Sequence, residues 1–209
     1  MRVPIATLVA ALVALAASGC SANAGPAPVQ SYSRTVLAVP HLGQEPMLCV
    51  PTSAAMVLAF YGDQRSPRLL KSLAAGRRYD PNAPFTDFTI TLYDDITRAV
   101  GDLGYGWFQH TFPNDDTGFD DGLSLIEKEL RGGHPVLVDA TLPSGHTFVI
   151  RGFDSNTHQL FAVDPNEPAP GQREISFDEF KAVWNERAYG NDIRAMIVTR
   201  PKSGPAIVS

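Results

Sequence analysis

The sequence predicts an α+β fold in which helices precede an antiparallel β-sheet. Apolar residues recur at helical spacing over much of the chain up to residue 103, whereas short apolar runs separated by turn-forming residues fill residues 135–199. Runs of helices followed by runs of strands are typical of this fold class. The length of 209 residues and the hydrophobic content of 44% suit one globular domain, and the sequence shows no internal repeat and no second domain.

The helices are predicted from apolar spacing and from residues that begin and end helices. The first is apolar almost all round, which indicates burial; Pro51 suits its first turn and Gly62 ends it. Ser66 is a candidate cap for the second helix. The acidic segment 114–122 is predicted to be a loop, and residues 176–179 form a capping-box pattern that opens the last helix. The predicted helices cover residues 51–61, 66–75, 91–103, 123–130 and 177 to about 184.

The strands are predicted from short apolar runs between turn residues. Residues 155–158 (SNTH) have turn chemistry and join two strands into a hairpin. In an earlier strand, Tyr105, Trp107 and Phe108 could line a substrate groove, although core packing is the favoured interpretation. The strand before residue 177 is short and is expected at a sheet edge. The predicted strands cover residues 35–40, 105–112, 135–140, 146–153, 159–163, 174–177 and 193–199.

The N-terminal residues resemble a bacterial export signal with a lipidation site. Arg2 precedes an uncharged run of small and apolar residues that ends at Ser18 and is too short for a bilayer-spanning helix, which needs roughly 20 apolar residues. Residues 17–20 (ASGC) resemble a lipobox, in which cleavage precedes a cysteine that carries a diacylglyceryl group. Ala17 stands where leucine is commonest. The alternative is ordinary secretory cleavage, which leaves Cys20 as a free thiol.

These features predict how the chain is divided and where it resides. Residues 1–19 are expected to be a lipoprotein signal peptide, 20–34 a tether, 35–200 the folded domain and 201–209 a tail. Removing the signal takes away one basic residue and no acidic one, so the net charge moves from −5 to −6. The membrane anchor is then the lipid on Cys20 and not attraction to anionic lipids. We expect an exported protein that is lipid-anchored to the bacterial cell envelope and faces the periplasm or the outer surface.

Composition argues against several function classes. An excess of 22 acidic over 17 basic residues argues against a nucleic-acid-binding surface. Two cysteines are too few for a multi-disulfide scaffold or a cysteine-only zinc site. The acidic residues between Asn114 and Asp121 lack the spacing of a calcium loop, and His41, His110 and His158 lack suitably spaced partners. His134 is expected to be a surface turn residue. We therefore expect no metal, no cofactor and a monomer.

Cys49 is the candidate nucleophile. It lies immediately before Val50 and Pro51, at the start of the most buried predicted helix. The positive end of the helix dipole and the unpaired backbone N–H groups there favour the thiolate, which is the reactive form of cysteine. If Cys20 is acylated, Cys49 has no partner within the chain, which marks it as a reactive-thiol candidate. The alternative is a buried, inert cysteine that packs as a small apolar residue.

Three further residues complete a candidate catalytic set around Cys49. Its backbone N–H and the side-chain amide of Gln44, five residues upstream, could donate to a developing oxyanion. His146 follows a Ser-Gly pair at the start of an apolar strand and is the best-placed base. Asp164 closes the partner strand of the hairpin, so its carboxylate could accept the Nδ1–H of His146. The alternatives are an exposed loop residue for Gln44, a strand cap for His146 and an Asx turn for Asp164.

Together these positions resemble the papain-like cysteine peptidases related to bacteriocin-processing peptidases, the peptidase C39-like family. The resemblance covers residues 38–200 and rests on Gln44, residues 49–53 (CVPTS), Gly145-His146 and residues 163–165 (VDP). It implies a papain-like fold with the nucleophile at the N-terminus of a buried helix packed on the sheet. It also implies the roles of the site residues: Cys49 as nucleophile, His146 as base, Asp164 as orienting group and Gln44 as oxyanion donor.

One position departs from the family pattern. Val50 stands where the family commonly has glycine, and a β-branched residue there is expected to alter the turn and narrow one side of the cleft.

The expected function is a membrane-anchored extracytoplasmic cysteine peptidase or amide hydrolase. It would act on a peptide or protein substrate through a thioester acyl-enzyme, without a cofactor. Two alternatives remain open: an acyl or peptidyl transferase that uses the same site, and a catalytically inactive module that binds peptides or cell-wall fragments. The best-known family members cut leader peptides after Gly-Gly, but they are cytoplasm-facing transporter domains, so that substrate is not carried over.

Overall fold

The structure of the protein is a computed structural model that describes residues 33–142 and 145–202. The predicted signal peptide, Cys20 and nearly all of the predicted tether and tail lie outside the described residues. Residues 32–209 group into one compact unit. Among the described residues, no helix combines the length and the apolar character that crossing a bilayer requires.

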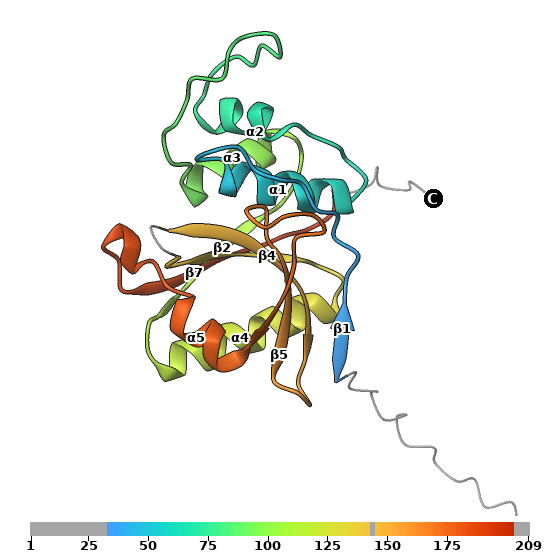
Figure 1. Cartoon of the computed structure of the whole chain (residues 1–209), viewed down its shortest axis with the longest axis vertical. Helices are drawn as coiled ribbons and strands as arrows, with labels where there is room; N and C mark the ends of the chain where they lie inside the picture. The colour runs from blue at the N-terminus through green and yellow to red at the C-terminus, as the bar shows by residue number, and fades with distance from the viewer. Residues whose placement is uncertain (1–32, 143–144, 203–209) are drawn as a thin grey trace, which may run out of the picture. The chain divides into compact units, whose positions relative to one another are not determined.

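The described residues build one antiparallel sheet of seven strands (Figure 1). Six strands follow the order β2-β7-β3-β4-β5-β6, and β1 pairs with β4 beyond the point where β3 ends. A side chain at Gly152 on β4 would lie 2.5 Å from the carbonyl oxygen of Thr35, so this close approach of β1 requires glycine. The strands are β1 (Arg34–Val36), β2 (Phe108–Pro113), β3 (Val136–Ala140), β4 (His146–Asp154), β5 (Gln159–Val163), β6 (Gln172–Ser176) and β7 (Ile193–Val198).

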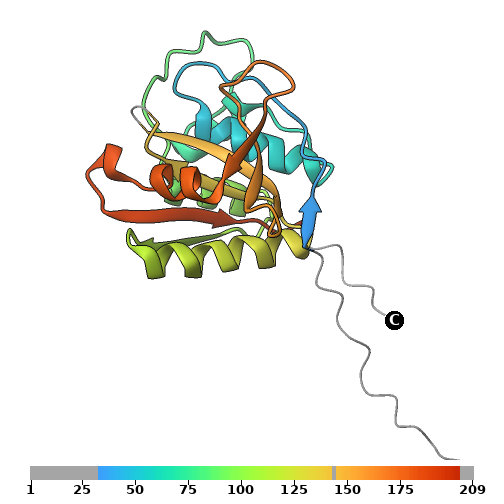
Figure 2. The ribbon, with the colours of Figure 1, turned by 60° about the horizontal axis from the view of Figure 1, so that its bottom comes forward.

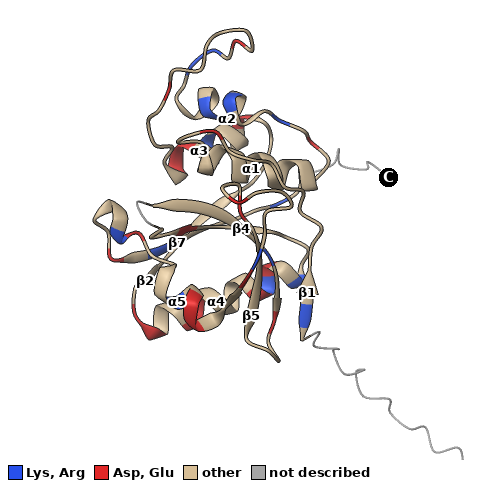
Figure 3. Ribbon diagram, viewed as in Figure 1, with Lys and Arg blue, Asp and Glu red and all other residues tan. Residues whose placement is uncertain are grey.

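Helices cover both faces of the sheet. Helices α1 to α3 lie on one face and α4 and α5 on the other, with α4 running along its face of the sheet (Figures 1 and 2). Acidic residues stand in the first turns of α3, α4 and α5, where the helix dipole favours negative charge (Figure 3). The helices are α1 (Cys49–Phe60), α2 (Pro67–Ala74), α3 (Tyr93–Asp102), α4 (Asp116–Arg131), α5 (Phe177–Val183) and the 3₁₀ helix η1 (Arg187–Tyr189).

Alternate residues of the central strands fill two separate cores. Leu137 of β3 and Val149 of β4 pack toward α1, whereas Val138 and Phe148 pack toward α4. All four side chains are fully buried. This two-sided burial explains why the sequences of β3 and β4 are almost continuously apolar. The α+β fold with helices first and an antiparallel sheet after them is therefore confirmed.

The hairpin and the capping box are confirmed as well. Strands β4 and β5 pair through Asp154 and Gln159 across the predicted turn. The Ser176 hydroxyl accepts a hydrogen bond from the Glu179 N–H at 3.2 Å, and the Glu179 carboxylate accepts one from the Ser176 N–H at 2.9 Å. Ser66 does precede α2, but its side chain makes no capping hydrogen bond.

The predicted loop over residues 114–122 is wrong, because α4 already begins at Asp116. The Asp115 carboxylate accepts a hydrogen bond from the Gly118 N–H at 2.8 Å and caps the helix. Two glycines of this segment are needed for close packing. A side chain at Gly118 would lie 2.1 Å from the Pro113 carbonyl oxygen, and one at Gly122 would lie 2.3 Å from the Trp184 ring.

Candidate active site

A cleft of about 450 Å³ opens at the start of α1. Its walls come from segments that are far apart in the sequence: the chain leading into α1, a stretch before α3, the start of β4, the loop after β5, strand β6 and η1. All four residues of the predicted catalytic set line this one cleft, namely Gln44, Cys49, His146 and Asp164.

Cys49 is the first residue of α1. Its thiol is free and partly exposed, whereas the next nine residues of the helix are buried. The Ser53 hydroxyl one turn later donates to the Thr147 carbonyl oxygen at 3.0 Å, which fastens α1 to β4 beside His146. The structure thus holds the thiol at the N-terminus of a rigid, buried helix.

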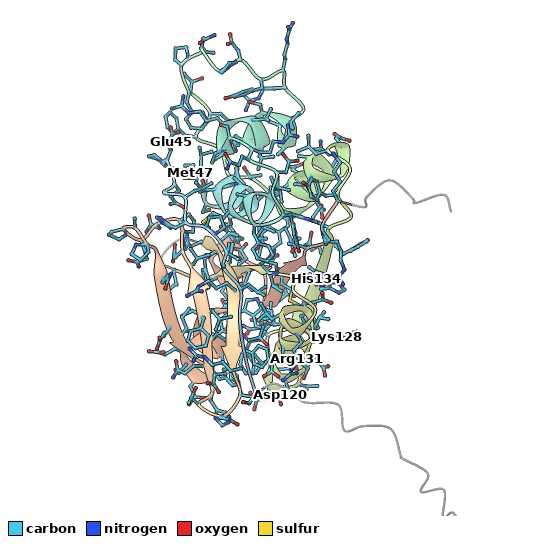
Figure 4. The ribbon with its side chains drawn as sticks, turned by 90° about the vertical axis from the view of Figure 1, so that its right-hand side faces the viewer. Glu45, Met47, Asp120, Lys128, Arg131 and His134 are labelled. Atoms are coloured by element: carbon cyan, nitrogen blue, oxygen red, sulfur yellow. The ribbon has the colours of Figure 1, made fainter. Side chains whose placement is uncertain are left out.

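The loop that leads into Cys49 is anchored by an ion pair to helix α2. Met47 has a φ of 63°, a left-handed conformation that is uncommon for residues other than glycine. The Glu45 carboxylate accepts two hydrogen bonds from the Arg68 guanidinium, at 2.9 and 2.6 Å, and this pair ties the loop to α2. Glu45 and Met47 both lie on this loop, beside the helices of the α1 layer (Figure 4). Val50 lies in the first helical turn, is buried, and both packs into the core and borders the cleft.

His146 and Asp164 face each other across the ends of β4 and β5. The His146 Nε2 atom lies 2.6 Å from the Asp164 Oδ1 atom, and both residues are buried. The hairpin produces this contact, because its register brings the start of β4 beside the end of β5.

The prediction that His146 would use Nδ1 toward Asp164 is wrong, because the Nε2 atom makes this contact. The ring also interacts with Cys49, and because Nε2 is occupied by Asp164, Nδ1 is the nitrogen left to face the sulfur. The edge of the ring nearer the backbone therefore faces α1, and the far edge reaches across to β5.

The electrostatics of the cleft favour a charged imidazole. Burial alone would lower the pKa of His146, but its hydrogen bonds to Asp164 and Cys49 raise that pKa to about 9. Burial would likewise raise the pKa of Asp164, but the contacts with His146, the Asn166 N–H and Arg173 lower it. At neutral pH the ring is therefore an imidazolium beside a carboxylate.

Arg173 is a site residue that the sequence analysis missed. Its Nη1 atom donates to the Asp164 Oδ2 atom at 3.0 Å, while the Asn166 N–H donates to Oδ1 at 2.9 Å. It lies on β6 opposite Ala162 of β5. The predicted strand began at residue 174, two residues after β6 begins, and so left Arg173 out. No local pattern marks an arginine on an edge strand as a partner of a carboxylate.

Gln44 is anchored to the loop after β5. Its backbone N–H donates to the Pro165 carbonyl oxygen at 2.8 Å, and its side-chain Nε2 donates to the Asn166 Oδ1 atom at 3.2 Å. An amide nitrogen carries two hydrogens, so the second remains for another acceptor. The Gln44 Oε1 atom is buried and has no hydrogen-bond partner among the described residues.

Lys71 of α2 holds the segment before α3, which forms one rim of the cleft. The side chain is only 3% exposed, and its ammonium donates to the Ile90 carbonyl oxygen at 3.1 Å and to the Thr91 hydroxyl at 3.0 Å. Ile90 and Thr91 both line the cleft. A buried lysine in an amphipathic helix gives no sequence signal of this role, because its partners lie in a segment without regular structure.

Other residues considered from the sequence lie away from the cleft. Tyr105 and Trp107 are buried in the core that faces α1, and Phe108 is 57% exposed on β2. Strand β2 begins at Phe108 and not at the predicted residue 105. His134 is half-buried and bonded to Glu129, so it is not a free surface turn residue. Within residues 33–142 and 145–202, no cluster of three or more His, Cys, Asp or Glu side chains could hold a metal ion.

Comparisons with known proteins agree with this arrangement. A family model described as the Peptidase_C39 like family matches residues 36–191. The crystal structure of the peptidase domain of Streptococcus ComA, a bifunctional ABC transporter involved in a quorum sensing pathway, is similar to this chain with a TM-score of 0.52 at 19% identity. That similarity covers 78% of this chain and 99% of the domain.

A second similar structure is a double glycine motif protease from an AMS/PCAT transporter, in complex with a leader peptide. Its TM-score is 0.50 at 18% identity, and the match covers 79% of this chain and 95% of that protease. These likenesses establish the papain-like fold. No curated protein matches the chain.

Proposed function

The chain belongs to the Peptidase_C39 like family, and we propose that it is a cysteine peptidase or amide hydrolase that acts through Cys49, His146 and Asp164. The observation that carries this proposal is the position of His146, which contacts Asp164 at 2.6 Å and interacts with Cys49 inside a cleft of about 450 Å³. A nucleophile, a base and a group that orients the base are the parts that covalent acyl transfer requires.

In the proposed reaction the Cys49 sulfur attacks the carbonyl carbon of the scissile amide. The His146 imidazolium gives its proton to the departing amine, and a thioester to Cys49 remains. His146 then takes a proton from water, which attacks the thioester and releases the acid and the thiolate. Asp164, held by Arg173, keeps the Nε2 edge of the ring occupied, so the Nδ1 edge stays turned toward the sulfur.

Gln44 and the backbone N–H of Cys49 are the proposed donors to the oxyanion. The free hydrogen on the Gln44 amide nitrogen suits this task, and the bond from Gln44 to Asn166 holds the amide in place. An amide fixed before the reaction stabilises developing charge without having to reorganise.

A peptide or protein is the proposed substrate. One similar structure holds a leader peptide, and the cleft of this chain is an open groove bordered by both apolar and charged side chains. The lipidation of Cys20 and the location at the bacterial cell envelope remain proposals that rest on the N-terminal sequence.

The proposal is tested with a mixture of proteome-derived peptides and mass spectrometry of the new termini. The purified full chain should generate new termini, and the Cys49→Ala variant should generate none above background. His134→Ala, which changes a histidine outside the cleft, is the matched control and should cleave like the wild type. Cleavage that persists in Cys49→Ala would refute the proposal.

A further inference from the structure

A second, smaller cavity of about 80 Å³ adjoins the cleft. Two carboxylates line it, from Asp139 on β3 and Glu186 before η1, together with the rings of Tyr93 and Tyr189 and the apolar side chains of Ile90 and Leu92. A cavity lined by both apolar side chains and carboxylates suits an alkyl chain with a terminal ammonium.

The two cavities share one wall. Ile90, Thr91 and Tyr189 line both of them. Tyr189 stands directly over the residue before His146, because a side chain at Gly145 would lie 2.2 Å from the Tyr189 hydroxyl. A ligand in the smaller cavity would therefore be close to the reacting atoms without touching them.

The two carboxylates of this cavity have few compensating contacts. Asp139 is only 6% exposed, and its one side-chain hydrogen bond is a long one of 3.4 Å from the Thr147 hydroxyl. Glu186 accepts a hydrogen bond from the Asn191 amide at 3.0 Å. Among the described residues, no lysine, arginine or histidine forms an ion pair with either carboxylate. A buried carboxylate is ordinarily paired, because leaving it without compensation is costly.

A second polar group in the same wall also lacks a partner. The Tyr93 hydroxyl is buried and makes no hydrogen bond of ordinary geometry, although Thr147 lies beside it. Tyr93 is 6% exposed and lines the cavity next to Asp139. An unpartnered hydroxyl and a weakly hydrogen-bonded carboxylate on one wall indicate a site that is completed by a donor from outside the chain.

We propose that this cavity, hereafter the ammonium pocket, binds a primary alkylammonium group in the catalytic cleft. The proposal rests on the proposed function, because it assigns the group either to a lysine-type side chain of the peptide substrate or to the bound end of a diamine whose other, neutral amino group accepts the acyl group. Asp139 and Glu186 bind the ammonium, and the rings of Tyr93 and Tyr189 pack against the methylene chain.

The titration of Asp139 agrees with this assignment. Burial, followed by the nearby Glu186 carboxylate, raises the pKa of Asp139 to about 7. The titratable groups that face it are Glu186, His146, Tyr93 and Tyr189. Protonation removes the charge that an ammonium needs, so binding should weaken as the pH falls below about 7.

The test uses chloroacetamides that alkylate Cys49 and carry either an aminoalkyl arm or an uncharged alkyl arm of equal length, over a series of arm lengths. Sulfur displaces chloride in every case, so only the arm differs. At pH 8 at least one aminoalkyl reagent should modify Cys49 of the full chain at least about fivefold faster than its uncharged partner. The Cys49 peptide, followed by mass spectrometry, separates this reaction from that of Cys20.

Two isosteric variants and one control locate the effect. Asp139→Asn and Glu186→Gln should each reduce the preference to less than about twofold. Glu167→Gln removes a carboxylate that borders the main cleft but not the ammonium pocket, and it should keep the full preference. Equal rates for every pair of reagents, or a preference that survives in both variants, would overturn the proposal.

Iodoacetamide, which has no arm, separates this failure from failure of the proposed function. Cys49 that reacts rapidly with iodoacetamide in a His146-dependent way, yet shows no preference for cationic arms, refutes the ammonium pocket alone. Cys49 that is slow with every reagent contradicts the proposed catalytic site itself.

Cadaverine, supplied while the enzyme hydrolyses the p-nitrophenyl ester of N-acetylglycine, distinguishes the two sources. N-acetylglycyl-cadaverine formed in excess of the direct aminolysis seen with Cys49→Ala assigns the pocket to an acceptor amine. Inhibition of ester hydrolysis by cadaverine without this product assigns the pocket to a substrate side chain. The absence of both effects counts against ammonium binding.

Discussion

Two carboxylates that are almost equally buried lie in opposite layers of this molecule and have opposite environments. Glu129, on α4, is 5% exposed and bonds both the Arg200 guanidinium and the His134 ring. Asp139, on the face of β3 toward α1 and α3, is 6% exposed and has no cationic partner in the described part of the chain. Burial would raise the pKa of both, but the contacts of Glu129 lower its pKa, whereas that of Asp139 rises to about 7.

This comparison distinguishes the α4 layer, in which the buried carboxylate is paired and stabilises the fold, from the cleft layer, in which the buried carboxylate remains available to a ligand. On the α4 side, His134 and Lys128 lie on or just beyond the helix, and the Glu129 contacts close onto the last strand and the residues after it (Figure 4). On the cleft side, unpartnered polar atoms remain on Gln44 and Tyr93, and Asp139 accepts only one long side-chain hydrogen bond. Unsatisfied polar groups reduce stability, and a ligand in the cleft would complete these.

The largest expected effect on stability is at Glu129. Glu129→Gln removes the charge that compensates Arg200 and should lower the free energy of unfolding by about 2 kcal/mol at pH 7, given that Arg200 is partly exposed. Because its pKa is lowered in the folded protein, this loss should shrink as the pH falls through the acid range. Urea denaturation at several pH values measures it, and a variant as stable as the wild type at pH 7 would remove the contrast between the layers.

A smaller effect of opposite sign is expected at Asp139. Its folded pKa of about 7 lies above the unfolded value, so the folded state binds the proton more tightly and stability falls as pH rises from about 4 to 7. Asp139→Asn removes this penalty and should be more stable than the wild type by about 1–2 kcal/mol at pH 8 but not at pH 4. A pH-independent difference would show that Asp139 is already compensated.

The smallest effect is expected at Arg173. Arg173→Gln leaves the Asp164–His146 contact in place but removes one of the groups that hold the carboxylate, and the guanidinium is one-third exposed. We expect the rate of Cys49 alkylation at pH 7 to fall by about threefold to tenfold, with partial recovery in Arg173→Lys. Unchanged rates in both variants would mean that the Asn166 N–H and His146 alone fix Asp164.

The sequence predicts best those features that are determined by residues close together along the chain. The contact between His146 and Asp164 follows from a hairpin whose turn and apolar strands are contiguous in the sequence. Cys49 at the start of α1 follows from the composition of a single helix. The capping box at Ser176 is a four-residue pattern and needs no tertiary information.

The missed features depend on packing between distant segments. Gly122 in α4 is required by Trp184, which lies far along the chain, so the acidic segment 114–122 was predicted as a loop without this packing information. The choice of Nε2 over Nδ1 depends on how the His146 ring is turned between α1 and β5. Residues of β3, the start of α3 and η1 line the ammonium pocket, and none of these segments carries a recognisable motif.

The most direct test of the central claim is the rate of Cys49 alkylation by iodoacetamide between pH 5 and 9, measured on the full chain beside His146→Ala and His134→Ala. A His146 pKa of about 9 keeps the imidazolium beside the sulfur throughout the neutral range. The account predicts fast alkylation that persists at pH 6, falls by at least about tenfold in His146→Ala and is unchanged in His134→Ala. Alkylation that is slow at pH 6 and equal in all three proteins would contradict the account.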